Sequence, residues 1–283
     1  MTSLVVARKD FADAVRARSL WALTALLVVL GAVMAYAFQV VQEQGPQQGG
    51  AVEVAAVDYV FFALSALILV LPVTAVVVCY KAIAGEAESG SLKLLLSLPH
   101  ERRDVVLGKW IGRTLVVSVA AVVGFLTSAV VGAVLFDQFS PLAYLVFLVL
   151  TVVYVAAYVA IVVGISATTT SSSRAATGAV GVFLVFELLW DVVPVGLYYL
   201  TQGSFPGAVA GPLWYRFLDL LPPSGAYVQA VGGLLSPDSA TGVALGTATD
   251  SALLSWWFAI ILLLLWTAVP LGLGYLRFRS LDL

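Results

Sequence analysis

The sequence predicts an all-α, polytopic membrane protein with six transmembrane helices, and two observations carry this prediction. Charged residues make up only 11% of the chain, 61% of residues are hydrophobic and the mean hydropathy is +1.04, whereas about a quarter of an ordinary soluble domain is charged. Six apolar windows also reach the roughly 20 residues that a helix needs to cross the hydrocarbon core of a bilayer. We therefore expect one transmembrane domain over residues 1–283, with the lipid bilayer as part of its solvent.

The expected spans cover residues 20–41, 59–80, 114–136, 142–167, 176–200 and 251–276. Five of these windows contain no charged residue, and the fifth span is interrupted by Glu187 and Asp191. Aromatic side chains stand near many of the window ends, as Trp21 and Tyr275 do. Such amphipathic rings favour the headgroup level of a membrane, so they support these boundaries.

The basic residues set the expected orientation. Both termini, the segment 81–113 and the segment 168–175 share one side of a six-span chain, and they hold all of the 14 basic residues except Arg216. Segments rich in Lys and Arg stay in the cytoplasm. We therefore expect both termini to be cytoplasmic, in the cell membrane of a prokaryote.

Residues 1–19 are expected to form an amphipathic helix before the first span. One face of the helical wheel is apolar and the other is charged; the apolar face carries Leu4, Ala7, Phe11, Ala14 and Val15, and the charged face Lys9, Asp10, Asp13 and Arg16. A helix with such faces lies along the membrane surface with its apolar side in the lipid. A short solvated tail is the alternative.

The segment 81–113 between spans two and three is far longer than a connection between adjacent spans needs. Glu86 and Glu88 suit the first turn of a helix, where carboxylates favour the positive end of the helix dipole. Leucines follow at helical spacing, a proline then ends the helix, and Arg102 and Arg103 indicate the return to the headgroups. We expect a short helix whose exposed apolar face docks a partner; the alternative is that its leucines pack beneath the chain's own spans.

One pattern in this segment is shared with a known family. It consists of Glu86, Glu88, Gly90, Ser91, Leu95, Leu96, Pro99, Arg102 and Lys109. The pattern resembles the intracellular loop of type-2 ATP-binding-cassette (ABC) permeases, in the branch with the permease of nitrous-oxide-reductase maturation. Family members more often have Thr in place of Ser91, which keeps the hydroxyl group, and Ser in place of Glu101, which changes the contacts there.

The resemblance implies a permease subunit of an ABC exporter with no catalytic site of its own. Its partners would be a second permease copy or a similar subunit, and P-loop ABC ATPase subunits that press on the loop pattern and on Leu92. ATP and Mg²⁺ would be bound by the ATPase, and this chain would bind no cofactor or metal directly. Gly108-Lys109 is the nearest match to a phosphate loop, but it lacks the upstream Gly and the following Ser or Thr.

Glu187 and Asp191 are spaced i, i+4 and are expected to share one face of the fifth span. An acid in hydrocarbon is costly unless it meets water or a partner, which makes both residues candidates for a translocation path or a subunit interface. Pro194 lies close by, so Asp191 alternatively sits at the outer interface.

The segment 201–250 lies on the outer side in this topology. Its Pro222-Pro223-Ser224-Gly225 element must interrupt a helix. The family resemblance suggests short re-entrant helices here that cap the outer end of the path. Arg216, the sole outer cation, either attracts an anionic substrate or pairs with Asp219.

Other function classes are less compatible with the sequence. An ATP-independent secondary transporter or channel usually shows inverted repeats and several intramembrane charges, of which only the two acids of span five give a hint. An intramembrane enzyme lacks the means for a histidine zinc site, because His100 is the single histidine, and Cys79 is the single cysteine. A net charge of −2 without a basic stripe gives no reason to expect nucleic acid as a partner.

Overall fold

The computed structural model describes residues 3–16, 18–44, 53–93, 101–135, 140–206, 211–235 and 251–281, and within these ranges the chain forms helices and turns with no strand. Six helical segments are long and apolar enough to cross a membrane: Leu20–Val41, Asp58–Glu88, Arg102–Leu135, Pro141–Ser166, Ser172–Gln202 and Trp256–Arg279. The predicted all-α class with six spans is confirmed.

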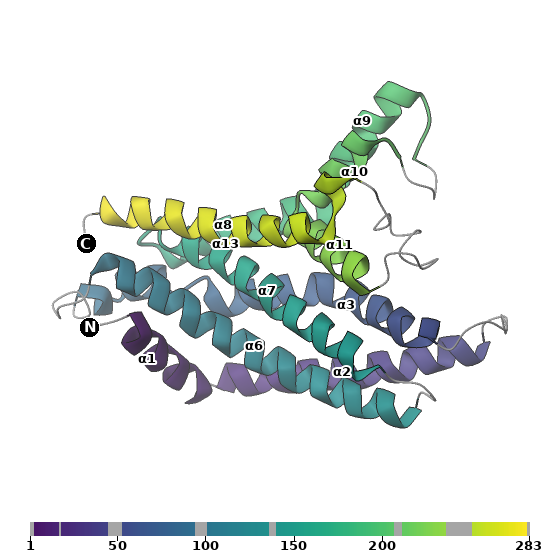
Figure 1. The fold of residues 1–283 in the computed structure, drawn as a ribbon. Coiled ribbons are helices and arrows are strands. Elements are labelled where there is room, and N and C mark those ends of the chain that lie inside the picture. The colour runs from purple at the N-terminus through teal and green to yellow at the C-terminus, as the bar shows by residue number, and fades with distance from the viewer. Residues whose placement is uncertain are drawn as a thin grey trace.

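The elements follow one another along the chain as shown in Figure 1. They are α1 (Ser3–Arg16), α2 (Arg18–Gln44), α3 (Glu53–Cys79), α4 (Ala84–Glu88), α6 (Arg102–Leu135), α7 (Pro141–Ser166), α8 (Ser172–Leu184), the π-helical turn η1 (Val185–Leu189), α9 (Val192–Gln202), α10 (Leu213–Leu220), α11 (Pro223–Leu235), the 3-10 turn η2 (Ala252–Leu254) and α13 (Trp256–Arg279).

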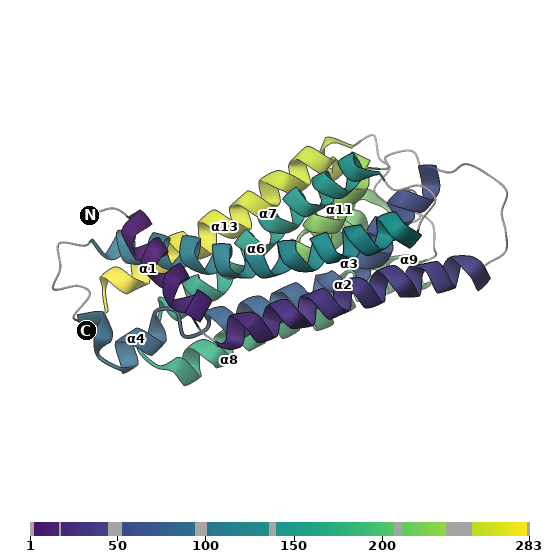
Figure 2. The same ribbon diagram turned by 90° about the horizontal axis from the view of Figure 1, so that it is seen from below.

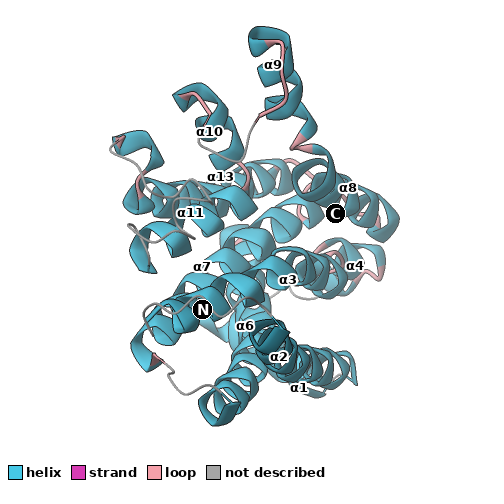
Figure 3. Ribbon diagram, turned by 90° about the vertical axis from the view of Figure 1, so that its right-hand side faces the viewer, coloured by secondary structure: helices cyan, strands magenta, loops and turns pink. Residues whose placement is uncertain are grey.

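The long helices run alongside one another in an elongated bundle (Figures 1 and 2). The chain starts and finishes at the same end of the bundle, where α1, α4 and the last turn of α13 lie. We call this the N/C end. At the opposite half of the molecule α9 and α10 lean away from the bundle (Figures 1 and 3). The two ends of the bundle are thus built differently.

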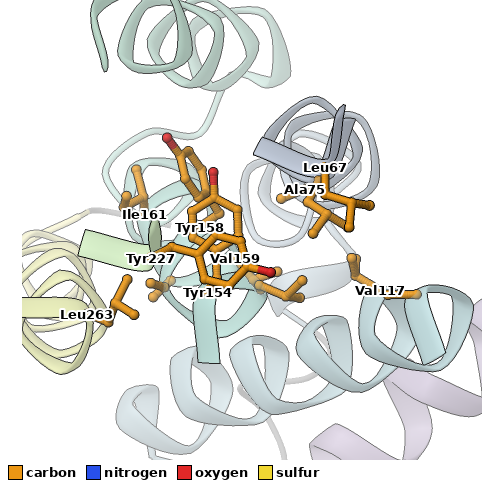
Figure 4. Packing of buried hydrophobic residues seen from close by; sticks show 14 of the residues in the cluster. Leu67, Ala75, Val117, Tyr154, Tyr158, Val159, Ile161, Tyr227 and Leu263 are labelled. Atoms are coloured by element: carbon orange, nitrogen blue, oxygen red, sulfur yellow. The ribbon is translucent and has the colours of Figure 1, made fainter. Parts of the chain in front are cut away.

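The centre of the bundle is α7, which packs against α3, α6, α11 and α13. Its buried aromatic rings form the heart of the core with one ring from α11, as Figure 4 shows for Tyr154, Tyr158 and Tyr227. The Tyr154 and Tyr227 rings are stacked with centroids 4.5 Å apart, and the Tyr154 hydroxyl donates to the Ile68 carbonyl of α3. The buried hydroxyl groups therefore help to fix the helices around α7.

Glycines allow two pairs of spans to approach closely. A Cβ on Gly124 of α6 would lie 2.8 Å from the Leu27 carbonyl oxygen of α2, and one on Gly164 of α7 would lie 2.5 Å from the Pro270 carbonyl oxygen of α13. No larger side chain fits at such distances. Small residues at helix contacts are the usual means of packing helices in lipid, where no hydrophobic force drives them together.

Several boundaries differ from the sequence prediction. The third span belongs to a helix that begins at Arg102, so Arg102 to Arg113 are helical and not loop. The sixth span begins at Trp256, after a 3-10 turn. The predicted break at the Pro-Pro element is confirmed, because α10 ends at Leu220 and α11 begins at Pro223; residues 207–210 and 236–250 lie outside the described ranges.

The helix predicted at the N-terminus is confirmed, but its buried face is a different one. Val6, Ala7, Asp10 and Ala14 are buried, while Leu4 is 65% exposed. Asp10 was expected on the charged, exposed face and is only 3% exposed. The reason is electrostatic, because cations on α6 bind this carboxylate.

Candidate functional site

The connection between spans two and three, residues 80–101, is called the coupling loop below. Its short helix α4 ends at Glu88, and the described chain is helical again at residues 91–93. Between them Gly90 has φ +76°, a conformation that glycine adopts readily. The hydroxyl groups of Ser89 and Ser91 both donate to the Glu86 carbonyl, at 3.2 and 3.3 Å. The helix expected to run on from Glu86 is therefore interrupted at Gly90, because this turn closes back on α4.

Ser166 at the end of α7 holds the start of the coupling loop. Its oxygen accepts from the backbone N–H groups of Ile83 and Ala84, at 3.1 and 3.0 Å, and its hydroxyl donates to the Tyr80 carbonyl at 2.8 Å. Ser166 is fully buried. The loop is thus fixed on the fourth span by three hydrogen bonds from one side chain.

A network of four charges lies behind α4. The Lys109 ammonium of α6 donates to Glu86 at 2.5 Å and to Asp10 of α1 at 2.8 Å. Arg113 Nη2 donates to Asp10 Oδ1 at 3.2 Å, and Arg113 Nε lies 2.9 Å from Asp10 Oδ2. The side chains of Lys109 and Asp10 are only 6% and 3% exposed, so this is a buried ion-pair network of two acids and two cations, which we call the Asp10 network.

The helix pattern of α6 explains why the network forms. Lys109 and Arg113 are four residues apart and project from one face of the helix. Gly108 and Gly112 let α1 approach that face, since a Cβ on Gly108 would lie 2.5 Å from Val6 Cβ. The Asp10 carboxylate is thereby brought between the two cations.

Glu88 connects the loop to the fifth span. Its Oε2 accepts from the Ser172 N–H at 3.2 Å, at the first residue of α8. A carboxylate at this position satisfies one of the unpaired N–H groups of a helix start and complements the positive end of its dipole. Glu88 is itself exposed, so it both faces solvent and caps α8.

Arg102 connects the start of the third span to the end of the sixth. Its Nη1 donates to the carbonyls of Phe278, Leu281 and Arg279 at 2.5, 3.0 and 3.1 Å. Its guanidinium also lies over the Phe278 ring, 5.5 Å from the centroid. Phe278 and Arg279 belong to the last turn of α13, where carbonyls lack the usual partner one turn further along the helix, and Leu281 follows that turn.

The predicted coupling residues therefore divide into two sets. Glu86, Arg102 and Lys109 are turned towards the chain, and so is Leu92, which is fully buried and not part of an exposed apolar face. The exposed positions of the described part of the loop are Lys81, Glu88, Ser89, Ser91, Lys93 and Glu101. Leu95, Leu96 and Pro99 lie outside the described residues.

The acids of span five lie in distinct surroundings. Glu187 is half-buried in the π-helical turn η1, where the Tyr158 hydroxyl of α7 donates to its carboxylate. Asp191 is exposed. A π-helical turn lengthens the hydrogen-bond spacing from i→i+4 to i→i+5. Residues four apart still lie about one turn apart, so the two acids are on the same side of span five although they differ in burial.

Arg216 lies on α10, half-buried, and burial lowers the pKa of its guanidinium from the ordinary value. The helix that carries it is tied to span five, because the Trp190 indole donates to the Leu218 carbonyl at 2.9 Å. A second indole, that of Trp266 on α13, donates to the Leu221 carbonyl at 2.8 Å. The helix α10 and the residue that follows it are thus attached to spans five and six.

Comparison with known proteins places this architecture in a family. The family model described as "ABC-2 family transporter protein" matches residues 4–283. The chain belongs to the ABC-2 transporter family. It is 30% identical, over 97% of its length and 96% of the relative's, to a protein named "Probable ABC transporter permease protein NosY" from Stutzerimonas stutzeri, and 28% identical over the same shares to the protein of that name from Pseudomonas aeruginosa. The family expected from the loop pattern is confirmed, and these relatives support a permease subunit.

Some site residues of this ABC-2 chain had no marker in the sequence pattern. The helical wheel placed Asp10 on a charged face, Arg113 was only one of the basic residues of its segment, and Ser166 was one of many span residues. One pattern did indicate a buried acid, namely the i, i+4 pair of cations on α6. Two neighbouring cations that become buried beside apolar residues need an acid as a partner. Among the described residues no group of three or more His, Cys, Asp or Glu side chains could hold a metal ion.

Proposed function

We propose that this chain is the membrane-spanning subunit of an ABC exporter, and that it transmits the work of a separate P-loop ATPase to the transport path. The observation that carries the proposal is the anchoring of the coupling loop. Hydrogen bonds and ion pairs join the coupling loop to α6, α7 and α8, and through Lys109 of α6 also to α1. Arg102, the next residue after the loop, binds the end of α13. A loop held by so many elements passes a displacement on to several spans, whereas a free loop would absorb it.

The orientation follows from the charge distribution. The N/C end carries nearly all of the chain's basic residues, so it is the cytoplasmic end of a protein in a prokaryotic cell membrane. The ATPase, which binds ATP and Mg²⁺, then meets the coupling loop from the cytosol. In this arrangement α1 lies along the inner surface of the membrane.

The docking surface for the ATPase is formed by the exposed side of the coupling loop. Glu88, Ser91 and Lys93 belong to that side, and Leu95, Leu96 and Pro99 complete the surface by the family pattern. Glu86, Arg102 and Lys109 act from behind, because their partners lie within the chain. Gly90 provides the turn between the two parts.

The functional unit contains a second permease copy or a similar subunit. The exposed apolar side chains of span five support this, since they stand beside an acid at membrane depth; they include Val185, Leu188, Leu189 and Val192. Glu187 and Asp191 then line the transport path or the contact between the two subunits. Arg216 and α10 lie at the outer end of that path.

Co-purification tests this proposal. The chain is co-expressed with the ABC ATPase encoded nearest to it in its source genome, purified by a tag on the chain and reconstituted in nanodiscs. We expect co-elution and an ATP turnover that differs from that of the ATPase alone. Absence of co-elution with the unmodified chain contradicts the proposed function.

A charge-reversal pair tests the docking surface. Glu88→Lys combined with Lys93→Glu should reduce co-elution about tenfold, the equivalent of roughly 1.4 kcal/mol of binding free energy. Arg174→Glu is the matched control, because Arg174 is exposed on α8 outside the loop. Equal co-elution of all three proteins would show that the ATPase docks elsewhere.

A further inference from the structure

Lys109 joins three elements that come from distant parts of the sequence. Its side chain belongs to α6, and its ammonium contacts Asp10 of α1 and Glu86 of α4 directly. These acids are 99 and 23 residues away from it along the chain. One nitrogen atom therefore connects the N-terminal helix, the coupling loop and the third span.

Burial makes this connection stiff. An exposed ion pair contributes little and is readily broken, and Arg103 of α6 with Glu101 at the end of the loop is such a pair, with side chains 61% and 67% exposed. Separation of Lys109 from either acid would instead remove one partner from charges at a buried site, since the Lys109 and Asp10 side chains are only 6% and 3% exposed, and this is unfavourable. The three elements consequently move together more easily than they move apart.

Arg113 extends the connection to α3. While it pairs with Asp10, its Nη1 donates to the Val78 carbonyl at the end of that helix, at 3.3 Å. The contact of α1 with α6 leaves little room for sliding, since a Cβ on Gly112 would lie 3.0 Å from the Ala7 carbonyl oxygen and from Asp10 Cβ. The N-terminal helix is therefore held both by charge and by close packing.

We propose that Asp10 and Lys109 are positioning residues that make α1 part of the moving unit of the transporter. A displacement of the coupling loop passes from Glu86 through Lys109 to Asp10, so that α1 shifts together with the loop and the third span. Through this contact α1 takes part in the motion and is not only a membrane anchor. The inference rests on the proposed function, because an ATPase must move the loop.

Distances between spin labels test this motion without a known substrate. Cys79, the single cysteine, is buried, and Cys79→Ala gives a background for label pairs at Asp13 of α1, Lys81 of the loop and Leu142 at the far end of α7, all of which are exposed. Lys81 is chosen because it is not one of the residues of the docking surface. The labelled chain, diluted with unlabelled chain, is reconstituted with the ATPase in nanodiscs. Distances are measured without nucleotide and with ATP under arrested hydrolysis.

For the unmodified network we expect the Asp13–Lys81 distance to be the same in both states and the Asp13–Leu142 distance to shift. With Glu86→Gln or Asp10→Asn, the ATPase still co-elutes, but the Asp13–Lys81 distance now changes between the states. Glu101→Gln removes the acid of the exposed pair with Arg103 and should keep the unmodified behaviour.

Two results overturn the inference while the proposed function stands. In the first, ATP moves the loop relative to α1 although the network is intact. In the second, both network variants keep the Asp13–Lys81 distance fixed. Lack of ATPase binding to the unmodified chain would instead overturn the proposed function. A size-exclusion profile identical to that of the unmodified chain shows that each variant is folded.

Discussion

Asp10 and Glu187 are both acids in an apolar chain, and they are held in opposite ways. Asp10 is almost completely buried and is bound by two cations, Lys109 and Arg113. Glu187 is half-buried, and its carboxylate accepts a hydrogen bond from the neutral hydroxyl group of Tyr158. The charge of Asp10 is thus balanced within the chain. That of Glu187 is left to be balanced by a proton, by cargo or by a second subunit.

The packing of the helices around the two acids also differs. Asp10 lies where α1 packs so closely onto glycines of α6 that an added Cβ would clash with α1. Glu187 lies in a π-helical turn of a span that presents apolar side chains such as Leu188 and Leu189 outwards. Single π-helical turns occur often at functional sites. The N/C end is therefore closely packed, whereas span five leaves apolar side chains exposed.

The largest effect is expected from Lys109→Met, which leaves Asp10 and Glu86 as acids without their shared cation. Loss of one partner of a buried pair should cost about 3 kcal/mol, at the lower end of the usual range because Arg113 still contacts Asp10. Thermal unfolding in nanodiscs, followed by size-exclusion, measures this loss. An unchanged midpoint would contradict a buried, stabilising network.

The next effect concerns packing at the same junction. Gly108→Ala places a Cβ 2.5 Å from Val6 Cβ and 2.8 Å from the Ser3 carbonyl oxygen, and such overpacking should cost about 1–3 kcal/mol. The control on span five is Gly181→Ala, where a Cβ meets nothing within 4 Å. There the change should be neutral or slightly stabilising. Equal unfolding midpoints for the two variants would contradict the difference in packing between the N/C end and span five.

Glu187→Gln should change stability by less than about 1 kcal/mol, because the amide oxygen still accepts from Tyr158. The expected effect is functional: ATP turnover of the reconstituted complex or its subunit stoichiometry should change. Tyr158→Phe, which removes the donor and keeps the charge, serves as the comparison. If turnover and stoichiometry are both unchanged in Glu187→Gln, the acid has no role in path or interface.

The smallest effect is expected from Glu88→Gln. The exposed carboxylate caps α8 through the Ser172 N–H, and an amide oxygen retains the hydrogen bond but not the charge at the dipole. Hydrogen exchange at the first turn of α8 should become faster, with exchange in α7 unchanged. Protection that equals that of the unmodified chain would mean that the charge at this position adds nothing.

Much of the fold follows from the sequence because the solvent dictates it. Windows without charge must cross lipid as helices, and Pro222-Pro223 must interrupt one. The details that were wrong depend on contacts between distant segments. Arg102 starts a helix and binds carbonyls of α13, and no local pattern shows that the end of the sixth span lies beside it.

The position of the candidate site along the chain was predictable, but which of its side chains face the interior was less so. The loop pattern located Glu86 and Lys109, which are in fact bound to each other. A helical wheel put Asp10 on the outer face because it counts an acid as polar. A wheel of one helix does not show that cations on another helix, here Lys109 and Arg113 of α6, bind the acid and allow its burial. Periodicity describes one helix, whereas the network belongs to three.

The bond from Arg102 to the Leu281 carbonyl has a consequence for how the ends of two spans move. The two residues are 179 positions apart along the chain, yet Arg102 begins the third span and Leu281 follows directly after the last turn of the sixth. With the further bonds from Arg102 to the Phe278 and Arg279 carbonyls, the start of α6 is fastened to the end of α13. A tilt of the sixth span therefore carries the start of the third span with it.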